Sequence, residues 1–263
     1  MEMDAALLAA LQWQIAMGAD EAIEPQPIAR APAPAAVAAP PPAPRRATSA
    51  ATLVPGQASE AETLAAGADS LEALLEAMRR FSGSPLRDTA TNLVFADGLP
   101  GAPVMIVGEA PGADEDRLGK PFVGVSGQLM DRMMASIGLT RARDLYVTNI
   151  LPYRPPGNRT PSDGEVSQFL PFVRRHIALA QPRILVLCGG VSAKGLLQTR
   201  EGITRLRGKW QKVQISASEV IPGLPTLHPA YLLRNPVAKR EAWADLLLLR
   251  QHLHDGEIVA APP

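Results

Sequence analysis

The sequence predicts an α/β fold in which a largely parallel sheet is covered by helices on both faces. Segments such as 104–107 and 184–188 are apolar at successive positions, which is typical of strands buried on both faces. Segments with the apolar spacing of helices alternate with such strands from about residue 92 onward. Sites in folds of this class form at the carboxyl ends of the strands, so a site is expected in the loops that follow the strands.

The N-terminal part of the chain is expected to lie outside this fold. Residues 1–22 carry leucine and alanine at helical spacing, with Gly18 as a stop, and predict one amphipathic helix. Residues 24–58 are dominated by proline and alanine, and such a stretch buries too little apolar surface to form a core. The expected organisation is a helix over 1–22, a flexible linker over 23–69, a domain over 70–256 and a tail over 257–263.

Within the domain, a helix is expected at 70–81 with Ser70 as its N-cap. The expected strands are 92–98, 103–111, 144–153, 183–190 and 221–229. The further expected helices are 126–139, 161–180, 190–198 and 236–253. Three loops of unusual composition follow Val107, Val147 and Leu227, and all three fall at the same edge of a parallel sheet. They can therefore converge on one cleft.

Composition narrows the functional class. The chain has 263 residues, 46% of them hydrophobic, which is enough to bury a core. Its net charge is zero, but residues 1–79 hold ten acidic residues and four arginines. Residues 80–263 therefore hold 22 basic and 16 acidic residues, a charge of about +6, which suits a polyanionic partner such as nucleic acid.

The single cysteine, Cys188, excludes a disulfide within the chain and any zinc or iron–sulfur site built from cysteines, and we expect a small buried side chain there. The N-terminus is acidic rather than basic, so no signal peptide is predicted. No apolar run reaches the roughly 18 residues of a membrane span. We therefore expect a soluble, intracellular protein.

The first unusual loop lies in VMIVGEAPGADEDRLGKPFVG, residues 104–124. It is rich in glycine but lacks the G-x-G-x-x-G spacing, and Glu109 and Asp114 would repel a pyrophosphate, so a dinucleotide site is disfavoured. A simple Gly-Pro turn with solvated acids remains an alternative.

The second loop, VTNILPYRPPGNRTP, begins with Asn149 at a strand end. Its side-chain amide presents a donor and an acceptor side by side, which matches the edge of a pyrimidine imide. Capping of the following turn is the alternative. Arg154 and Arg159 lie in a proline-rich loop and suit phosphate contacts.

The third loop, TLHPAYLLRNP, holds His228 between a strand and Pro229. A lone histidine is more often structural, but two leucines, Leu232 and Leu233, follow beside Arg234. Leucines exposed beside a positive charge suit a wedge that unstacks bases. Burial of both leucines in a core helix is the alternative.

Together, these loops resemble the uracil-DNA glycosylase superfamily, specifically its family 4 type, which usually contains an iron–sulfur cluster. The resemblance covers about residues 80–253 and rests on four motifs. They are GEAPGADEDRLGKPFVGVSGQLMDRMM, YVTNILPYRPPGNR, ITRLRGKW and TLHPAYLLRNP. The resemblance implies a three-layer α/β/α sandwich with a central, mainly parallel sheet of four strands.

The resemblance also implies how a uracil would be recognised. The deoxyuridine would be flipped out of the stack into a pocket formed in part by Gly108 and Ala110. Phe122 would stack on the uracil, and Asn149 would pair with its O4 and N3, which rejects cytosine because the donor and acceptor are exchanged there. Glu115 would lie near the pyrimidine C5 and hinder thymine.

The same resemblance assigns the chemistry and the DNA contacts. His228 would donate to the uracil O2 and stabilise the leaving group, while Glu109 would activate the attacking water and favour the cationic sugar. Leu232 or Leu233 would fill the gap left in the duplex, and Arg234 would lie near the backbone. The loop after the Asn149 strand contains no histidine, so covalent capture of the product is not expected.

The sequence departs from the family at the cluster. Four positions that hold cysteines in the family are, in our alignment, Phe81, Ser84, Tyr153 and Phe169. Thiolates are required for such a cluster, so no cofactor and no metal are expected. We expect packed side chains to fill the volume of the cluster.

These inferences give a monofunctional uracil-DNA glycosylase of base excision repair as the leading hypothesis. The alternative is a catalytically silent relative that only binds DNA. The expected partner is DNA containing uracil, and the expected location is the cytoplasm, at the nucleoid. We expect a monomer without membrane contact, in which the helix at 1–22 docks on a protein partner or packs on its own domain.

Overall fold

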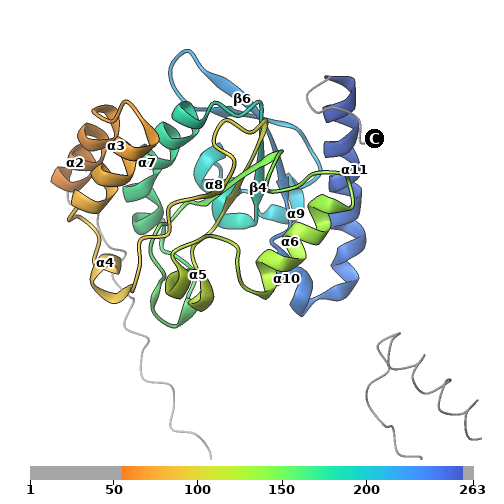
Figure 1. Cartoon of the computed structure of the whole chain (residues 1–263), viewed down its shortest axis with the longest axis horizontal. Coiled ribbons are helices and arrows are strands. Elements are labelled where there is room, and N and C mark those ends of the chain that lie inside the picture. Colours follow the sequence, from red (N-terminus) through yellow and green to blue (C-terminus); the bar gives the residue numbers. More distant parts are fainter. Residues whose placement is uncertain (1–54, 257–263) are drawn as a thin grey trace, which may run out of the picture. The chain divides into compact units, whose positions relative to one another are not determined.

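The computed structural model describes residues 55–256, which contain a six-stranded sheet of order β1-β3-β2-β4-β6-β5 (Figure 1). The strands are β1 (Asp97–Gly98), β2 (Val104–Gly108), β3 (Leu145–Asn149), β4 (Ile184–Cys188), β5 (Gln211–Gln214) and β6 (Val220–Thr226). The four central strands, β3, β2, β4 and β6, run parallel, and β1 and β5 pair antiparallel at the two edges. The predicted α/β fold is confirmed.

The sheet has six strands, whereas the sequence pattern predicts five and the resemblance implies four. Only two residues of the expected strand 92–98 form a ladder, at one edge. Strand β5 is not predicted because its sequence QKVQ is polar and only Val213 is buried, as suits an antiparallel edge strand. Both additions flank the parallel core without changing it.

Helices cover both faces of the sheet. Their bounds are α2 (Pro55–Ala66), α3 (Leu71–Arg80), α4 (Leu86–Thr89), α5 (Ala113–Leu118), α6 (Val125–Ala135), α7 (Asp163–Ala180), α8 (Gly190–Leu197), α9 (Ile203–Leu206), α10 (Pro229–Arg234) and α11 (Lys239–Asp255). Two 3-10 turns, η1 (Pro156–Asn158) and η2 (Pro236–Ala238), complete the list. No described helix is long and apolar enough to cross a membrane.

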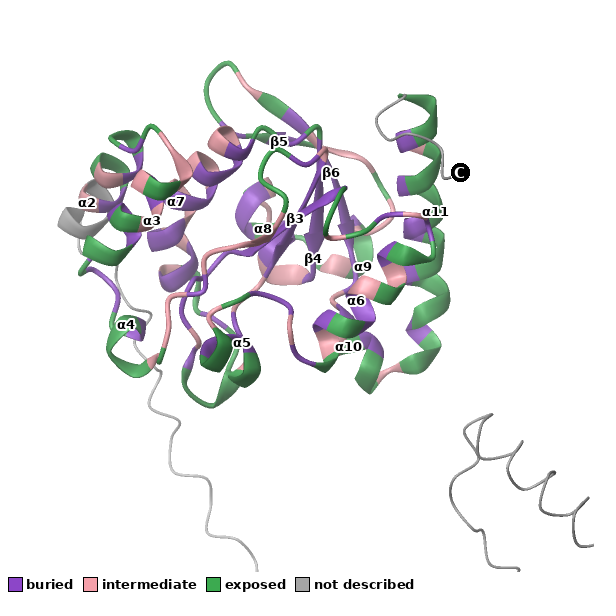
Figure 2. Cartoon of the chain, viewed as in Figure 1, coloured by how far each residue is buried: buried purple, intermediate pink, exposed green. Residues whose placement is uncertain are grey.

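The two faces have separate cores, because successive strand residues point in opposite directions. In β2, Met105 and Val107 pack with residues of α2, α3, α7 and α8, whereas Val104 and Ile106 pack with residues of α6 and α11. All four side chains are fully buried. Figure 2 shows buried strands at the centre and helices around them that combine buried and exposed residues. This arrangement explains why the strands are apolar throughout.

Helix α2 differs from the expectation, which placed residues 23–69 in a linker. Ala61 and Ala65 of this helix are buried in the core that contains α7, and Arg175 of α7 donates to the carbonyl of Ala68 at 2.7 Å. Alanine has the highest helix propensity, and its small side chain permits close helix packing. An alanine-rich composition therefore does not separate a linker from a packed helix. The helix at 1–22 and the tail at 257–263 lie outside the described residues.

Two helices begin directly after a serine that caps them, Ser70 and Ser162. Ser70 caps α3 by accepting from the amide of Ala73 at 3.1 Å, as expected. Ser162 and Glu165 form a reciprocal capping box at the start of α7. Because α7 follows the loop that contains Arg159, this capping also fixes one side of the site described next.

Candidate active site

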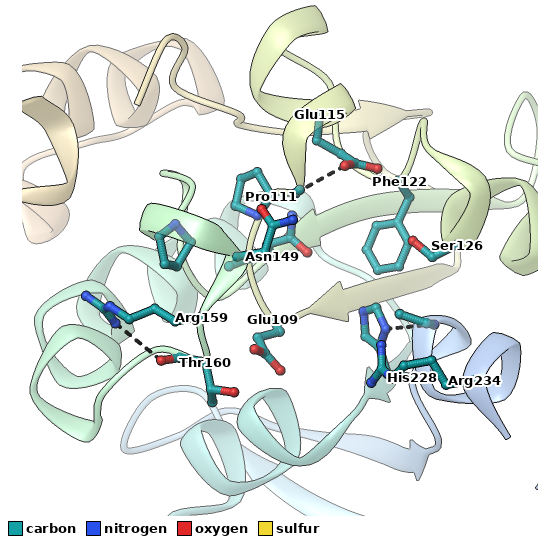
Figure 3. A pocket seen from close by; sticks show the side chains of 15 residues that line it. Glu109, Pro111, Glu115, Phe122, Ser126, Asn149, Arg159, Thr160, His228 and Arg234 are labelled. Atoms are coloured by element: carbon teal, nitrogen blue, oxygen red, sulfur yellow. Dashed lines mark hydrogen bonds between the residues drawn. The ribbon is translucent and has the colours of Figure 1, made fainter. Parts of the chain in front are cut away.

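The three unusual loops converge at the carboxyl ends of β2, β3 and β6, as predicted. They line a cavity of about 380 Å³. Figure 3 shows Glu109, Asn149 and His228 around this space, each from a different loop. The other predicted residues that line it are Ala110, Glu115, Phe122, Arg159 and Arg234.

Gly108 brings two of these side chains together. It ends β2 and pairs with Asn149 of β3. A Cβ at position 108 would lie 2.3 Å from Asn149 Oδ1 and 2.5 Å from Phe122 Cζ, distances that real side chains do not tolerate. The absence of a side chain at position 108 therefore allows the amide and the ring to share one wall of the cavity.

The Asn149 amide is buried and open to a ligand. Its side chain is only 6% exposed and lines the cavity. Within residues 55–256, no group forms a hydrogen bond with this side-chain amide, so it does not cap the following turn. Its nitrogen and oxygen atoms are not fully enclosed by protein and reach the cavity. Its donor and acceptor therefore remain available for a ligand with complementary groups.

Phe122 is held in an uncommon backbone conformation, with φ at 54°. The guanidinium of Arg141 donates to the carbonyls of Pro121 at 3.1 Å and Phe122 at 2.9 Å. A Cβ at Gly127 would lie 1.9 Å from the Phe122 carbonyl oxygen, so glycine is required where α6 passes under this loop. The loop thus fixes the Phe122 ring, which stacks near His228 with 5.7 Å between ring centroids.

His228 has a defined tautomer. Its Nδ1 accepts from the backbone amide of Ala230 at 3.1 Å, which makes the side chain the N-cap of α10. Burial, with a smaller effect of the positive charge of Arg234, lowers the pKa of His228 to about 4. The ring is therefore neutral at pH 7, and its proton lies on Nε2, where it can be donated to a ligand.

Glu109 directly follows β2 and is half-buried. Burial raises the pKa of this carboxyl, and the nearby positive charge of Arg234 opposes the rise. A carboxylate with a raised pKa accepts a proton more readily than a solvated one. Glu109 is thus suited to act as a base at the cavity.

Glu115 has a structural role that the sequence does not reveal. Its carboxylate accepts from the amides of Gly112 at 3.1 Å, Val123 at 3.0 Å and Gly124 at 2.9 Å. It therefore ties the start of α5 to the loop that carries Phe122. The expected contact of Glu115 with the C5 of a pyrimidine is untested, although the residue does line the cavity.

The two leucines expected to form a wedge lie in the short helix α10, and not in a loop. Leu232 is only 1% exposed and packs with Leu129, Leu227 and Ala238. A residue that holds α10 in the core cannot insert into DNA, so the alternative of burial is correct for Leu232. Leu233 is 39% exposed and remains available.

The two arginines of the second loop make contacts within the protein. Arg159 lines the cavity and donates to both carboxylate oxygens of Glu165, at 2.9 and 2.6 Å. This contact lowers the pKa of Glu165 to about 2. Arg154 donates from Nε to Asn158 Oδ1 at 2.7 Å. Sequence reasoning missed Ser126, Asn158, Thr160 and Ala230, which also line the cavity.

An aromatic cluster lies away from the cavity. Phe81 and Phe169 are fully buried with their ring centroids 5.6 Å apart, and Tyr153 lies 6.0 Å from Phe169. Phe172 adds a fourth ring, and Ser84 is buried as well. Cys188 is buried on β4. No group of three or more His, Cys, Asp or Glu side chains in the described ranges is placed to hold a metal ion.

Comparison with known proteins agrees with this geometry. The family described as the uracil DNA glycosylase superfamily matches residues 95–247. A type-4 uracil-DNA glycosylase of Pyrobaculum aerophilum is 37% identical over 182 residues, which cover 68% of this chain and 92% of that protein. A type-4 uracil-DNA glycosylase of Sulfurisphaera tokodaii is 36% identical over 188 residues, 70% of this chain and 84% of that protein.

Proposed function

Because this chain belongs to the uracil DNA glycosylase superfamily, we propose that it hydrolyses the N-glycosidic bond of deoxyuridine in DNA. The products are free uracil and an abasic site, and the reaction is the first step of base excision repair. The observation that carries this proposal is the single cavity lined by Glu109, Asn149 and His228.

Recognition begins when the deoxyuridine leaves the base stack and enters the cavity. The ring of Phe122 stacks on the uracil. The amide of Asn149 donates to O4 and accepts from N3–H, a pairing that cytosine cannot make because its N4 is a donor and its N3 an acceptor. The unpaired amide and the fixed ring described above support these two roles, since both are in place before the ligand arrives.

Bond cleavage places negative charge on the uracil and positive charge on the sugar. The Nε2–H of His228 donates to the uracil O2, where negative charge develops. Glu109 orients the attacking water and takes its proton, and its charge favours the cationic sugar. The pKa shifts support this division of roles. The lowered pKa of His228 keeps the ring neutral, so that it can donate a proton from Nε2. The raised pKa of Glu109 makes its carboxylate a stronger base.

DNA contacts surround the cavity. We assign the wedge to Leu233 alone, since Leu232 is buried, and place Arg234 beside the DNA backbone. Residues 1–22 are proposed to bind a protein partner, and the enzyme is proposed to act as a monomer.

The aromatic cluster takes the place of an iron–sulfur cluster in this proposal. Phe81, Ser84, Tyr153 and Phe169 correspond to the four cysteines of the family in our alignment, and three of them pack ring against ring. Iron–sulfur clusters need thiolate ligands. We expect purified protein to contain no stoichiometric iron and to keep its activity after treatment with a chelator. Iron analysis with activity assays before and after treatment checks both points.

The test of the function uses a uracil-containing oligonucleotide and detects abasic sites by alkaline cleavage. The wild type should cleave it, while His228→Gln and Asn149→Ala should each lower the rate by roughly 100-fold or more. His254→Gln, on the exposed end of α11, is the matched control and should behave as the wild type. A wild type that binds the oligonucleotide but releases no uracil would show the silent DNA-binding relative instead.

A further inference from the structure

A second hollow adjoins the cavity just described. It measures about 570 Å³ and lies between α7 and α8. Glu109 and Thr160 line both spaces, so the two adjoin at these residues. A strand whose nucleotide occupies the first cavity therefore passes close to the second.

The hollow has an apolar floor. Val166 and Leu170 of α7 and Val191 of α8 contribute to its lining. Gly195 allows the two helices to approach, because a Cβ there would already lie 3.2 Å from Val166 Cγ1 and 3.5 Å from Leu170 Cδ2. The roles assigned to the first cavity do not account for this floor.

The rim of the hollow carries positive charge. Lys194 and Arg200 line it, and both are exposed. Neither forms an ion pair with any residue in the part of the chain that the structure describes. Two carboxylates, Asp163 and Glu109, also contribute to the lining, and neither pairs with Lys194 or Arg200. The remaining polar lining residues are uncharged: Thr160, Ser167, Gln198 and Thr199. Unpaired cations above an apolar floor suit a ligand with a flat apolar face and an anionic group.

We propose that this hollow is a subsite for the nucleotide next to the deoxyuridine on the same DNA strand. Its base lies on the floor formed by Val166, Leu170 and Val191, and the adjoining phosphates bind Lys194 and Arg200. Proteins that hold single strands combine a base-contacting platform with a cationic track in this way. The inference rests on the proposed function, because that function supplies a polyanionic strand that must leave the first cavity.

The subsite has a consequence for Glu109, which stands between the two spaces. A nucleotide bound in the hollow covers the side of Glu109 that faces away from the uracil. The subsite thereby limits exchange of the attacking water with bulk solvent, and it ties binding of a neighbouring nucleotide to the reacting centre.

The experiment measures uracil release from three single-stranded oligonucleotides: one extended on both sides of the uracil, one on the 5′ side only and one on the 3′ side only. The variants are Lys194→Ala, Arg200→Ala and the double variant. Arg183→Ala is the matched control, since Arg183 is exposed, precedes β4 at the amino ends of the parallel strands and lines neither hollow.

We expect the double variant to raise KM roughly tenfold on the two-sided substrate and on one of the one-sided substrates, with kcat changed less than about twofold. Its KM on the other one-sided substrate should equal that of the wild type. The slope of log KM against log salt should shrink by about 0.7 for each phosphate that the variant no longer neutralises.

Equal effects on both one-sided substrates, no effect on any substrate, or a matching effect of Arg183→Ala would each overturn the subsite. If the wild type releases no uracil at all, the proposed function fails. The subsite is then tested by binding, with the same oligonucleotides labelled for fluorescence anisotropy. The Kd of the double variant should rise for the two-sided substrate and for one of the one-sided substrates, and should not change for the other.

Discussion

At the scale of single residues, the site depends on groups whose state is set by their surroundings. Asn149 is buried without a partner, and His228 is fixed in one tautomer by the amide of Ala230. Burial has the larger effect on the pKa of His228, which it lowers, and of Glu109, which it raises, and the positive charge of Arg234 shifts both pKa values downward. The electrostatics of the cavity can therefore be adjusted from one surface position.

Replacing Arg234 with Gln should shift the pH dependence of uracil release. Loss of the positive charge raises the pKa of Glu109 further, and in the proposed mechanism Glu109 acts in its deprotonated form. The acid limb of kcat/KM should therefore move to higher pH, which a pH–rate profile measures. Arg240→Gln, on the exposed side of α11, should leave the profile unchanged. An acid limb that stays in place in Arg234→Gln would show that Glu109 is not the group that titrates.

Arg141 offers a second residue-scale prediction. Replacing it with Met removes the two donors to the carbonyls of Pro121 and Phe122, so the Phe122 ring should lose its fixed position. We expect weaker inhibition by free uracil, by roughly tenfold, with partial recovery in Arg141→Lys. Inhibition constants for uracil measure the effect directly, because a change that only lowers stability leaves them unaltered in the folded protein. An unchanged inhibition constant in Arg141→Met would show that Arg141 does not position the Phe122 ring for uracil binding.

Sequence alone predicts that Glu109, Asn149 and His228 meet at one cavity, because each lies at or just after the carboxyl end of a predicted parallel strand. Sequence alone cannot tell that Leu232 is buried and Leu233 is exposed, since the two adjacent leucines differ only in which side of a short helix they occupy. It also misses the structural role of Glu115, whose carboxylate oxygens are used by amides up to nine residues away. Such contacts depend on how two loops fold together, and no local pattern records them.

At the scale of elements, the aromatic cluster joins α3, α7 and the loop after β3. Phe81 ends α3, Phe169 and Phe172 lie on α7, and Tyr153 follows β3. The cluster thus connects the helical layer to the loop that enters the cavity.

Phe169→Ala should lower the free energy of unfolding by about 3–5 kcal/mol, because the ring is fully buried among three others. Phe169→Leu keeps more volume and should cost less. Urea unfolding followed by circular dichroism measures both. A decrease below about 1 kcal/mol in Phe169→Ala would show that the ring does not hold these elements together.

The elements also show where sequence patterns fail. Strands β2, β3, β4 and β6 and the long helices are predictable because their apolar spacing is regular. Helix α2 is not, because its alanines continue the composition of the segment before it. Its burial against α7 depends on tertiary packing, which the amino-acid composition of the segment does not reveal.

At the scale of the whole molecule, every residue that lines the two hollows lies between positions 109 and 234. Among the described residues, positions 55–79 supply none of them. The lining therefore comes from residues 80–263, the part of the sequence that carries a charge of about +6.

Removal of residues 1–54 should leave kcat/KM on a short uracil oligonucleotide within about twofold of the full chain. The truncated protein should also keep its urea midpoint, because α2 and the core it joins are retained. Loss of binding to a repair partner, with activity intact, is the result expected for a protein-binding segment. A tenfold fall in kcat/KM would place part of this segment in catalysis.

The N-cap formed by His228 couples the proposed leaving-group contact to the helix that is proposed to contact DNA. The lone pair that begins α10 belongs to the ring that we propose to face the uracil, and α10 carries Leu233 and Arg234. Acidification below about pH 4 would occupy that lone pair with a proton, so the helix would lose its cap as the ring gains charge. Protonation of this one ring would then weaken DNA binding by α10 and, at the same time, disturb the contact with the leaving uracil.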